Sequence, residues 1–230
     1  MDTTTTIDAQ RARMRLLQLV SPSLPVGAFA YSQGIEWAVE AGWISGAGDL
    51  EDWLQGLLES SIGQWEVPML ARMYNACERG DGSALVKLSQ RLLASRESRE
   101  LRQEEIQRGR ALATLLADLG VERAQQWRDI LSSSQMAGFA LATSRWRIPL
   151  AEAAEGYVWA WLENLVLAAV KIIPLGQTAG QRVLLHLSEG IPEAVCTALA
   201  LADDDIGASS PALAIASSLH ETQYTRLFRS

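Results

Sequence analysis

The chain has 230 residues, of which 48% are hydrophobic and 20% charged, and its formal net charge is -7. This composition is that of a folded globular protein, and the length suits one large domain. The acidic balance offers no broad basic face to a phosphate backbone, which argues against DNA or RNA as a partner. Cys77 and Cys196 lie outside any C-x-x-C pattern. Two buried, reduced thiols are therefore expected rather than a disulfide framework.

The first eight residues, MDTTTTID, are polar and lack the basic and apolar regions of a secretory signal. We expect a flexible N-terminal tail over residues 1-8. The most apolar stretch, residues 157-173, contains Glu163, Asn164 and Lys171. It therefore falls short of the roughly 20 apolar residues that a membrane span requires. A cytoplasmic protein is expected.

Apolar residues recur at intervals of three and four along almost every segment, and strand-like alternation is nearly absent. Pro68 suits the first turn of a helix, and Gly80 and Gly82 suit a stop followed by a new start. The sequence thus predicts an all-α fold, a single-domain helical bundle of about ten helices over residues 9-205, with a C-terminal interaction tail over 206-230. The helices are expected near residues 9-20, 32-41, 49-64, 68-79, 83-96, 99-118, 121-134, 136-146, 150-173, 178-189 and 192-202.

Nucleotide and metal chemistry lack their usual residues. The dipeptide Gly-Lys of a phosphate-binding loop does not occur, so any GTP or ATP dependence must come from a partner. His186 lies in the apolar run LLHL, which is typical of a core or boundary histidine. His220 could make a transient metal contact, but no stable metal site and no cofactor are expected.

Residues 30-34, AYSQG, have the A-x-S-x-G shape of a loosened nucleophile elbow. The alternative that follows is a serine hydrolase that uses Ser32, with His220 as a distant base. A nucleophile elbow needs a preceding β-strand, and Pro22 and Pro25 do not suit a central strand. We favour Ser32 as a helix N-cap and a protein that is not an enzyme.

Two charged segments have more than one interpretation. The run from Arg96 to Arg110 places Arg96 with Glu100 and Glu104 with Arg108 at i, i+4. These pairs form either a solvated helix face or a docking surface. In the C-terminal tail, Tyr224 and Phe228 are one helical turn apart among arginines. Such residues are typical of interface anchors, although a tail docked on its own core is the alternative.

Three separated blocks and the tail resemble the urease accessory protein F (UreF) family. The blocks are SPSLPVGAFAYSQGIEWAVEAGWI at 21-44, SRESRELRQEE at 95-105 continuing into Gly109, and AAVKIIPLGQTAGQRVL at 168-184, followed by HETQYTRLFRS at 220-230. One departure is Ser218-Leu219, where the family pattern suggests a Met/Arg-like pair.

The resemblance implies an all-helical, homodimeric adaptor that is not itself an enzyme. Such an adaptor bridges the accessory protein UreD (also called UreH) and the GTPase UreG, regulates GTP hydrolysis, and enables nickel insertion into apo-urease. A helical adaptor for another GTPase-driven metallochaperone system is the alternative.

The resemblance also assigns residues to three groups. The GTPase-facing group is Glu36, Lys171, Gln33 and Gln177. The group expected to contact a UreD-type partner is His220, Glu221, Tyr224, Arg226, Leu227, Phe228 and Arg229. The structural loop positions are Pro22, Pro25, Gly27, Gly34, Pro174 and Gly176.

Overall fold

The computed structural model describes residues 3-230, which form α-helices and short helical turns and no β-strand. The predicted all-α fold is confirmed. The helices are α1 (Thr3–Val20), α2 (Ile35–Glu40), α3 (Ala47–Leu57), α4 (Val67–Arg79), α5 (Gly82–Ser95), α6 (Arg99–Asp118), α7 (Arg128–Ser133), α8 (Gln135–Arg145), α9 (Leu150–Ile172), α10 (Gln177–Ser188), α11 (Ile191–Leu199) and α12 (Pro211–His220). Two 3-10 turns, η1 (Ala28–Ala30) and η3 (Asp203–Asp205), and a π-helical segment, η2 (Leu58–Glu66), complete the list.

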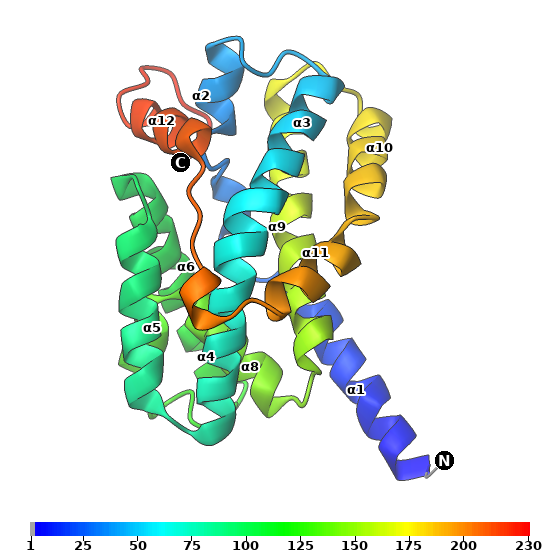
Figure 1. The fold of residues 1–230 in the computed structure, drawn as a ribbon, viewed down its shortest axis with the longest axis vertical. Helices are drawn as coiled ribbons and strands as arrows, with labels where there is room; N and C mark the ends of the chain where they lie inside the picture. The colour runs from blue at the N-terminus through cyan, green and yellow to red at the C-terminus, as the bar shows by residue number, and fades with distance from the viewer. Residues whose placement is uncertain (1–2) are drawn as a thin grey trace.

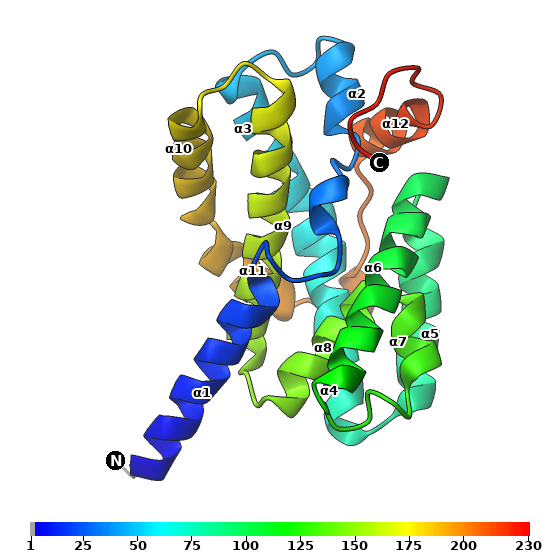
Figure 2. The ribbon, with the colours of Figure 1, turned by 180° about the vertical axis from the view of Figure 1, so that it is seen from behind.

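The long helix α9 runs through the middle of the bundle, with α10, α11 and α1 against it (Figures 1 and 2). Its buried side chains recur every three or four residues, as at Ala154, Val158, Leu162, Leu165 and Ala169. This spacing puts them on one side of the helix, where they join the hydrophobic core. A second layer, made of α4, α6, α7 and α8, packs side by side on the other part of the bundle.

One predicted break is absent. The sequence predicts separate helices over 49-64 and 68-79, but α3, η2 and α4 follow one another without a gap from Ala47 to Arg79. Pro68 is the second residue of α4 and comes directly after the π-helical turns of η2. The π-helical turns of η2 end at Glu66, whose side chain is buried.

Both ends of the chain contain helical residues that the sequence did not predict. Helix α1 begins at Thr3, inside the segment expected to be flexible, and projects from the body of the molecule (Figure 1). Helix α12 lies inside the predicted interaction tail and packs against α2 and α6. Of the two cysteines, Cys77 is buried as expected, but Cys196 is exposed on α11. None of the helices within residues 3-230 is both long and apolar enough to span a lipid bilayer.

Candidate partner-binding site

The end of the chain folds back onto the start of α2. Gly34 takes a left-handed conformation with φ +82° at the N-cap position of α2. A Cβ atom there would lie 3.0 Å from the backbone nitrogen of Ser217, so only glycine allows α12 to pack this closely. The close approach brings His220, at the end of α12, to the first turn of α2.

Glu36 holds the segment that follows α12. Its carboxylate accepts hydrogen bonds from the backbone nitrogens of Leu227, at 2.6 Å, and Phe228, at 2.9 Å. The His220 Nε2 atom lies 3.1 Å from the same carboxylate. Glu36 is only 8% exposed, so these contacts stabilise a buried charge that would otherwise be costly.

Glu100, in the first turn of α6, completes what we call the tail cluster: Glu36, Glu100, His220 and Arg226. The carboxylate of Glu100 lies 2.6 Å from His220 Nδ1 and accepts a hydrogen bond of 2.7 Å from Arg226. Both ring nitrogens of His220 therefore face carboxylates, and the side chain is fully buried. The ring has no nitrogen left for a metal ion in this arrangement. Within residues 3-230, no group of three or more His, Cys, Asp or Glu side chains is placed to hold one.

Ser32 binds the last residue of the chain. Its hydroxyl donates to the main-chain oxygen of Ser230 at 2.6 Å, and its backbone nitrogen donates to the same atom at 2.7 Å. The hydroxyl also accepts from the Glu36 nitrogen at 3.3 Å. The predicted N-cap position is wrong by two residues, since Gly34 occupies it, yet Ser32 still satisfies an amide of the first turn. Because Ser32 contacts Ser230 and His220 contacts carboxylates, the nucleophile–base pair of the hydrolase alternative is not formed.

The last residues divide into inward and outward side chains. Phe228 is 5% exposed, and the Lys171 amine lies 5.6 Å from its ring centroid, within cation–π range. In contrast, Tyr224 is fully exposed and Leu227 is 63% exposed. Ile215 and Leu219, one turn apart on α12, are also exposed. We call Ile215, Leu219, Tyr224 and Leu227 the tail patch.

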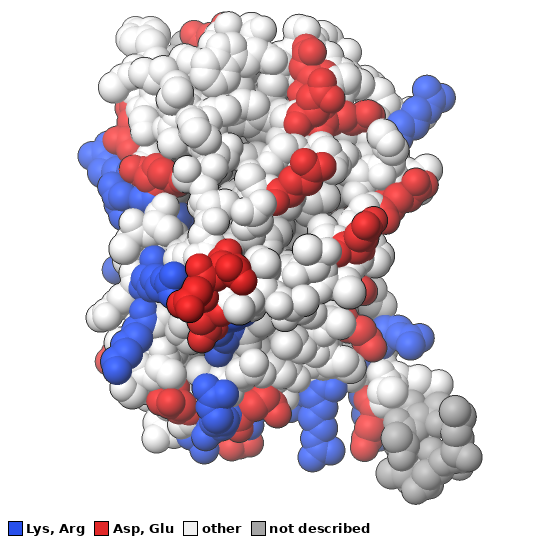
Figure 3. Space-filling view, in the orientation of Figure 1, with Lys and Arg blue, Asp and Glu red and all other residues white. Residues whose placement is uncertain are grey.

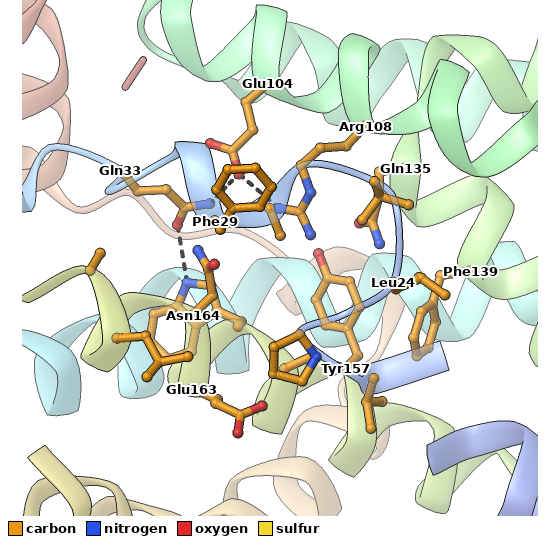
Figure 4. Close-up of a pocket in the computed structure, with 18 of the residues that line it drawn as sticks. Leu24, Phe29, Gln33, Glu104, Arg108, Gln135, Phe139, Tyr157, Glu163 and Asn164 are labelled. Carbon is orange, nitrogen blue, oxygen red and sulfur yellow. Dashed lines mark hydrogen bonds and ion pairs between the residues drawn. The ribbon is translucent and has the colours of Figure 1, made fainter. Parts of the chain in front are cut away.

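A cavity of about 170 Å³ lies between α6, α9 and the loop that precedes α2. Figure 4 shows Glu104 and Arg108 on the α6 side and Tyr157, Glu163 and Asn164 on the α9 side. Arg108 donates to Glu104 at 2.8 Å, and burial raises the pKa of Glu163. Two hydrogen bonds of the Gln33 side chain fix the loop to the cavity wall. Gln33 donates one to Glu104 at 3.0 Å and accepts the other from the Trp161 ring nitrogen at 3.1 Å.

A second buried set of charges borders this cavity, and we call it the core cluster: Glu66, Arg96, Glu105, Ser134 and Tyr157. Arg96 pairs with both Glu66 and Glu105, and Tyr157 donates to Glu66 at 2.6 Å. Burial alone would raise the pKa of Glu105. Arg96 and the donors Met136 N and Ser134 Oγ outweigh it, so the pKa is lowered. Burial and the two glutamates raise the pKa of Tyr157 well above its usual value.

Comparison with known proteins decides the family. The UreF family model matches residues 44–188. The chain belongs to the UreF family. It is 56% identical to the urease accessory protein UreF of Alcanivorax borkumensis over 95% of this chain and 98% of that protein. The proteins of the same name from Alkalilimnicola ehrlichii (51%, 95% of this chain, 96% of that protein) and Pseudomonas putida (49%, 97% and 100%) are similar over comparable lengths.

In this UreF-family chain, residues predicted for two different partner surfaces meet. Glu36 and Lys171, from the predicted GTPase-facing group, both contact the C-terminal segment assigned to the UreD-type partner. Gln33 is half-buried against the cavity, and Gln177 is exposed at the start of α10. The Glu221 carboxylate accepts a hydrogen bond of 2.7 Å from the backbone nitrogen of Arg99. The Arg229 guanidinium donates a hydrogen bond of 3.4 Å to the side-chain oxygen of Gln107. Contact of these residues with partner proteins stays a prediction.

The six loop positions lie where the chain changes direction around these contacts. Pro22 and Pro25 fall in the loop after α1, and Gly27, with φ +73°, precedes η1. Pro174 follows the end of α9, and Gly176 is the N-cap of α10.

Glu100 is the residue that sequence reasoning placed wrongly. The i, i+4 spacing predicts a pair with Arg96, but Arg96 follows α5 in an extended conformation and points to Glu66 and Glu105. The other predicted pair, Glu104 with Arg108, is confirmed because both residues lie on α6. The His220 partners could not be found from spacing, since they lie 120 and 184 residues away.

Proposed function

We propose that this protein is a non-catalytic adaptor of urease maturation in the cytoplasm. It acts as a homodimer, bridges a UreD/UreH-type accessory protein and a UreG-type GTPase, regulates GTP hydrolysis, and enables nickel insertion into apo-urease. The membership of the UreF family carries this proposal, since the relatives are named urease accessory proteins.

The tail patch supports a UreD-type contact. Its four side chains are each exposed, on α12 and the segment that follows it. Aromatic and aliphatic side chains of this kind are typical anchors of a protein interface. Phe228 has a different role in this proposal. It is an internal anchor that fixes the segment against Lys171, so that Tyr224 and Leu227 are presented outward.

The GTPase contact is assigned to exposed residues near the end of α9 and the start of α10. Lys171 and Gln177 are exposed there and are available for direct contact. Glu36 is buried beneath the C-terminal segment, so it acts through that segment. A partner that binds the segment would therefore change the environment of Lys171 as well.

The experiment is size-exclusion chromatography with light scattering on the protein alone and with UreD-type and UreG-type proteins. The unmodified protein should elute as a dimer and co-elute with both partners. The Tyr224→Ala/Leu227→Ala variant should bind the UreD-type protein at least about tenfold more weakly. The control is Leu185→Ala on α10, because Leu185 is 66% exposed and lies outside the tail patch. If the double variant and the control co-eluted equally with the UreD-type protein, the assignment of the tail patch to this contact would be overturned.

A cellular test distinguishes a role in urease maturation from a role in the maturation of another metal enzyme. Deletion of the gene should abolish urease activity, and excess nickel should partly restore it. Normal urease activity in the deletion strain would contradict the proposed role.

A further inference from the structure

A groove of about 430 Å³ lies between α1 and the turn that joins α8 to α9. It is at the far end of the molecule from α12 and the C-terminus (Figures 1 and 2). Five arginines line the groove, against the two acids Asp8 and Glu152, which gives it a formal charge of +3 in a chain of net charge -7. The arginines are Arg11, Arg13, Arg15, Arg145 and Arg147. Figure 3 shows Lys and Arg side chains, with Asp and Glu side chains among them, at this lower end of the molecule.

Three of the five arginines have partners inside the protein, and one of these, Arg145, donates a hydrogen bond from its guanidinium to the Cys77 oxygen. Arg11 has one weak ion pair, at 3.5 Å from Asp8, and both side chains are exposed. The Arg15 guanidinium lies 5.8 Å from the centre of the Trp146 ring and donates to Gln18. Arg13 and Arg147 are exposed and make no ion pair or side-chain hydrogen bond with the residues that the structure describes. Their guanidinium groups are therefore available to a ligand.

Arg147 occupies a backbone position that favours glycine. Its φ is +55°, in the left-handed region, directly after the end of α8. The Ile148 nitrogen donates to the Thr143 oxygen at 2.9 Å, and the Arg147 nitrogen donates to the Ser144 oxygen at 3.0 Å. These bonds form the helix ending in which glycine is the usual left-handed residue. An arginine here has a conformational cost that glycine would not have, which points to a role for its side chain.

We propose that this groove binds an acidic segment of a partner protein. The planar guanidinium groups match carboxylates and can bind them through two parallel hydrogen bonds. Ala9, Trp146 and Pro149 also line the groove, and these apolar groups favour a peptide, whose side chains can pack against them. A nucleic acid is disfavoured because the chain as a whole is acidic, with a net charge of -7. The groove shares no residue with the tail patch, so this binding is independent of the proposed adaptor contacts.

The test is fluorescence anisotropy at low salt with a short labelled peptide of alternating Glu and Ala residues. The unmodified protein should bind the peptide saturably, and binding should weaken as salt is added. Arg13→Gln/Arg147→Gln should weaken binding about tenfold or more. The control, Arg182→Gln, removes an exposed arginine on α10 outside the groove and should change binding less than about twofold.

A second variant keeps the proposal testable if the double variant folds poorly. Arg147→Gly removes the side chain and relieves the left-handed backbone, so thermal stability should hold or rise while peptide binding falls. Absence of saturable peptide binding to the unmodified protein would overturn the proposal. The proposal would also be overturned if Arg182→Gln weakened peptide binding as much as Arg13→Gln/Arg147→Gln. Tighter binding of duplex DNA or of phosphatidylserine vesicles than of the peptide, in the same titration, would also overturn the choice of partner.

Discussion

The core cluster and the tail cluster are both buried groups of glutamates held by basic side chains, but they hold different parts of the molecule. In the core cluster, Arg96 joins Glu66 at the end of η2 to Glu105 on α6. In the tail cluster, Glu36 and Glu100 hold His220 and the last few residues of the chain. The first cluster connects helices within the bundle, and the second connects the bundle to its C-terminal segment.

The two clusters differ in which part of the protein is destabilised when the cluster is broken. Loss of the core cluster leaves charges buried between helices of the bundle, so the whole domain must become less stable. Loss of the tail cluster can be relieved by release of the last residues into water, where the freed groups are solvated. The core cluster should therefore affect global unfolding, whereas the tail cluster should chiefly affect local opening at the tail patch.

Arg96→Ala should have the largest effect. Removal of the guanidinium leaves Glu66 and Glu105 without their buried counter-charge. The free energy of unfolding should fall by about 3–5 kcal/mol, measured by urea denaturation. Arg110→Ala, which removes an exposed arginine on α6, should change it by less than about 0.5 kcal/mol. Similar stability of the two variants would show that the core cluster does not hold the bundle together.

Gly34→Ala should destabilise the contact between α2 and α12 by about 2–4 kcal/mol. The new methyl group would combine a left-handed backbone with a 3.0 Å approach to Ser217. Gly42→Ala is the matched control, because Gly42 also has a positive φ, of +75°, but has no atom within 4 Å of the added Cβ. The control should cost only about 1–2 kcal/mol. Equal losses in thermal unfolding would show that the close packing of α12 contributes nothing.

Acid should weaken the core cluster. The pKa of Glu105 in the folded protein is below its ordinary value of 4.5, so its ionised form is favoured by folding. This contribution is complete above about pH 4.5 and is lost as the pH falls through the lowered value. In urea titrations at decreasing pH, the unmodified protein should lose stability more steeply than Glu105→Gln. Parallel slopes for the two proteins would contradict the role given to Glu105.

Glu36→Gln should release the C-terminal segment without unfolding the bundle. The neutral amide loses the charge-assisted bonds to Leu227 N, Phe228 N and His220, worth about 2 kcal/mol. Carboxypeptidase digestion of the tail should therefore accelerate about tenfold or more, with little change in helical circular dichroism. Glu193→Gln, at an exposed position on α11, should digest at the unmodified rate. A protected tail in Glu36→Gln would mean that other contacts hold it.

Periodicity predicted the helices well because a buried helix face needs an apolar residue every three or four positions, and α9 follows this pattern. It missed α12, whose segment PALAIASSLH is apolar around most of its surface and has no clear polar face. It also placed a break before Pro68, since proline marks helix starts, although here the turns of η2 lead directly into α4.

The candidate site was only partly predictable. The i, i+4 spacing correctly predicts the ion pair between Glu104 and Arg108. It predicts the wrong partner for Arg96, because the rule requires both residues to lie on one helix. The Glu36 contacts with the tail join residues up to 192 positions apart, which only the folded chain brings together. Tyr224 and Phe228 look alike in the sequence, and their opposite exposure depends on how the segment crosses α2 and α9.

Lys171→Gln should have the smallest effect, and it separates two roles for this residue. The cation–π contact with Phe228 is worth about 0.5–1 kcal/mol at an exposed site, so carboxypeptidase digestion of the tail should accelerate only about two- to fivefold. Lys171→Arg keeps the cation and should protect the tail as the unmodified protein does. If Lys171 also contacts a UreG-type GTPase directly, Lys171→Gln should weaken co-elution with the GTPase by more than the loss of tail protection accounts for. Normal GTPase binding by a variant with a loosened tail would restrict Lys171 to holding Phe228.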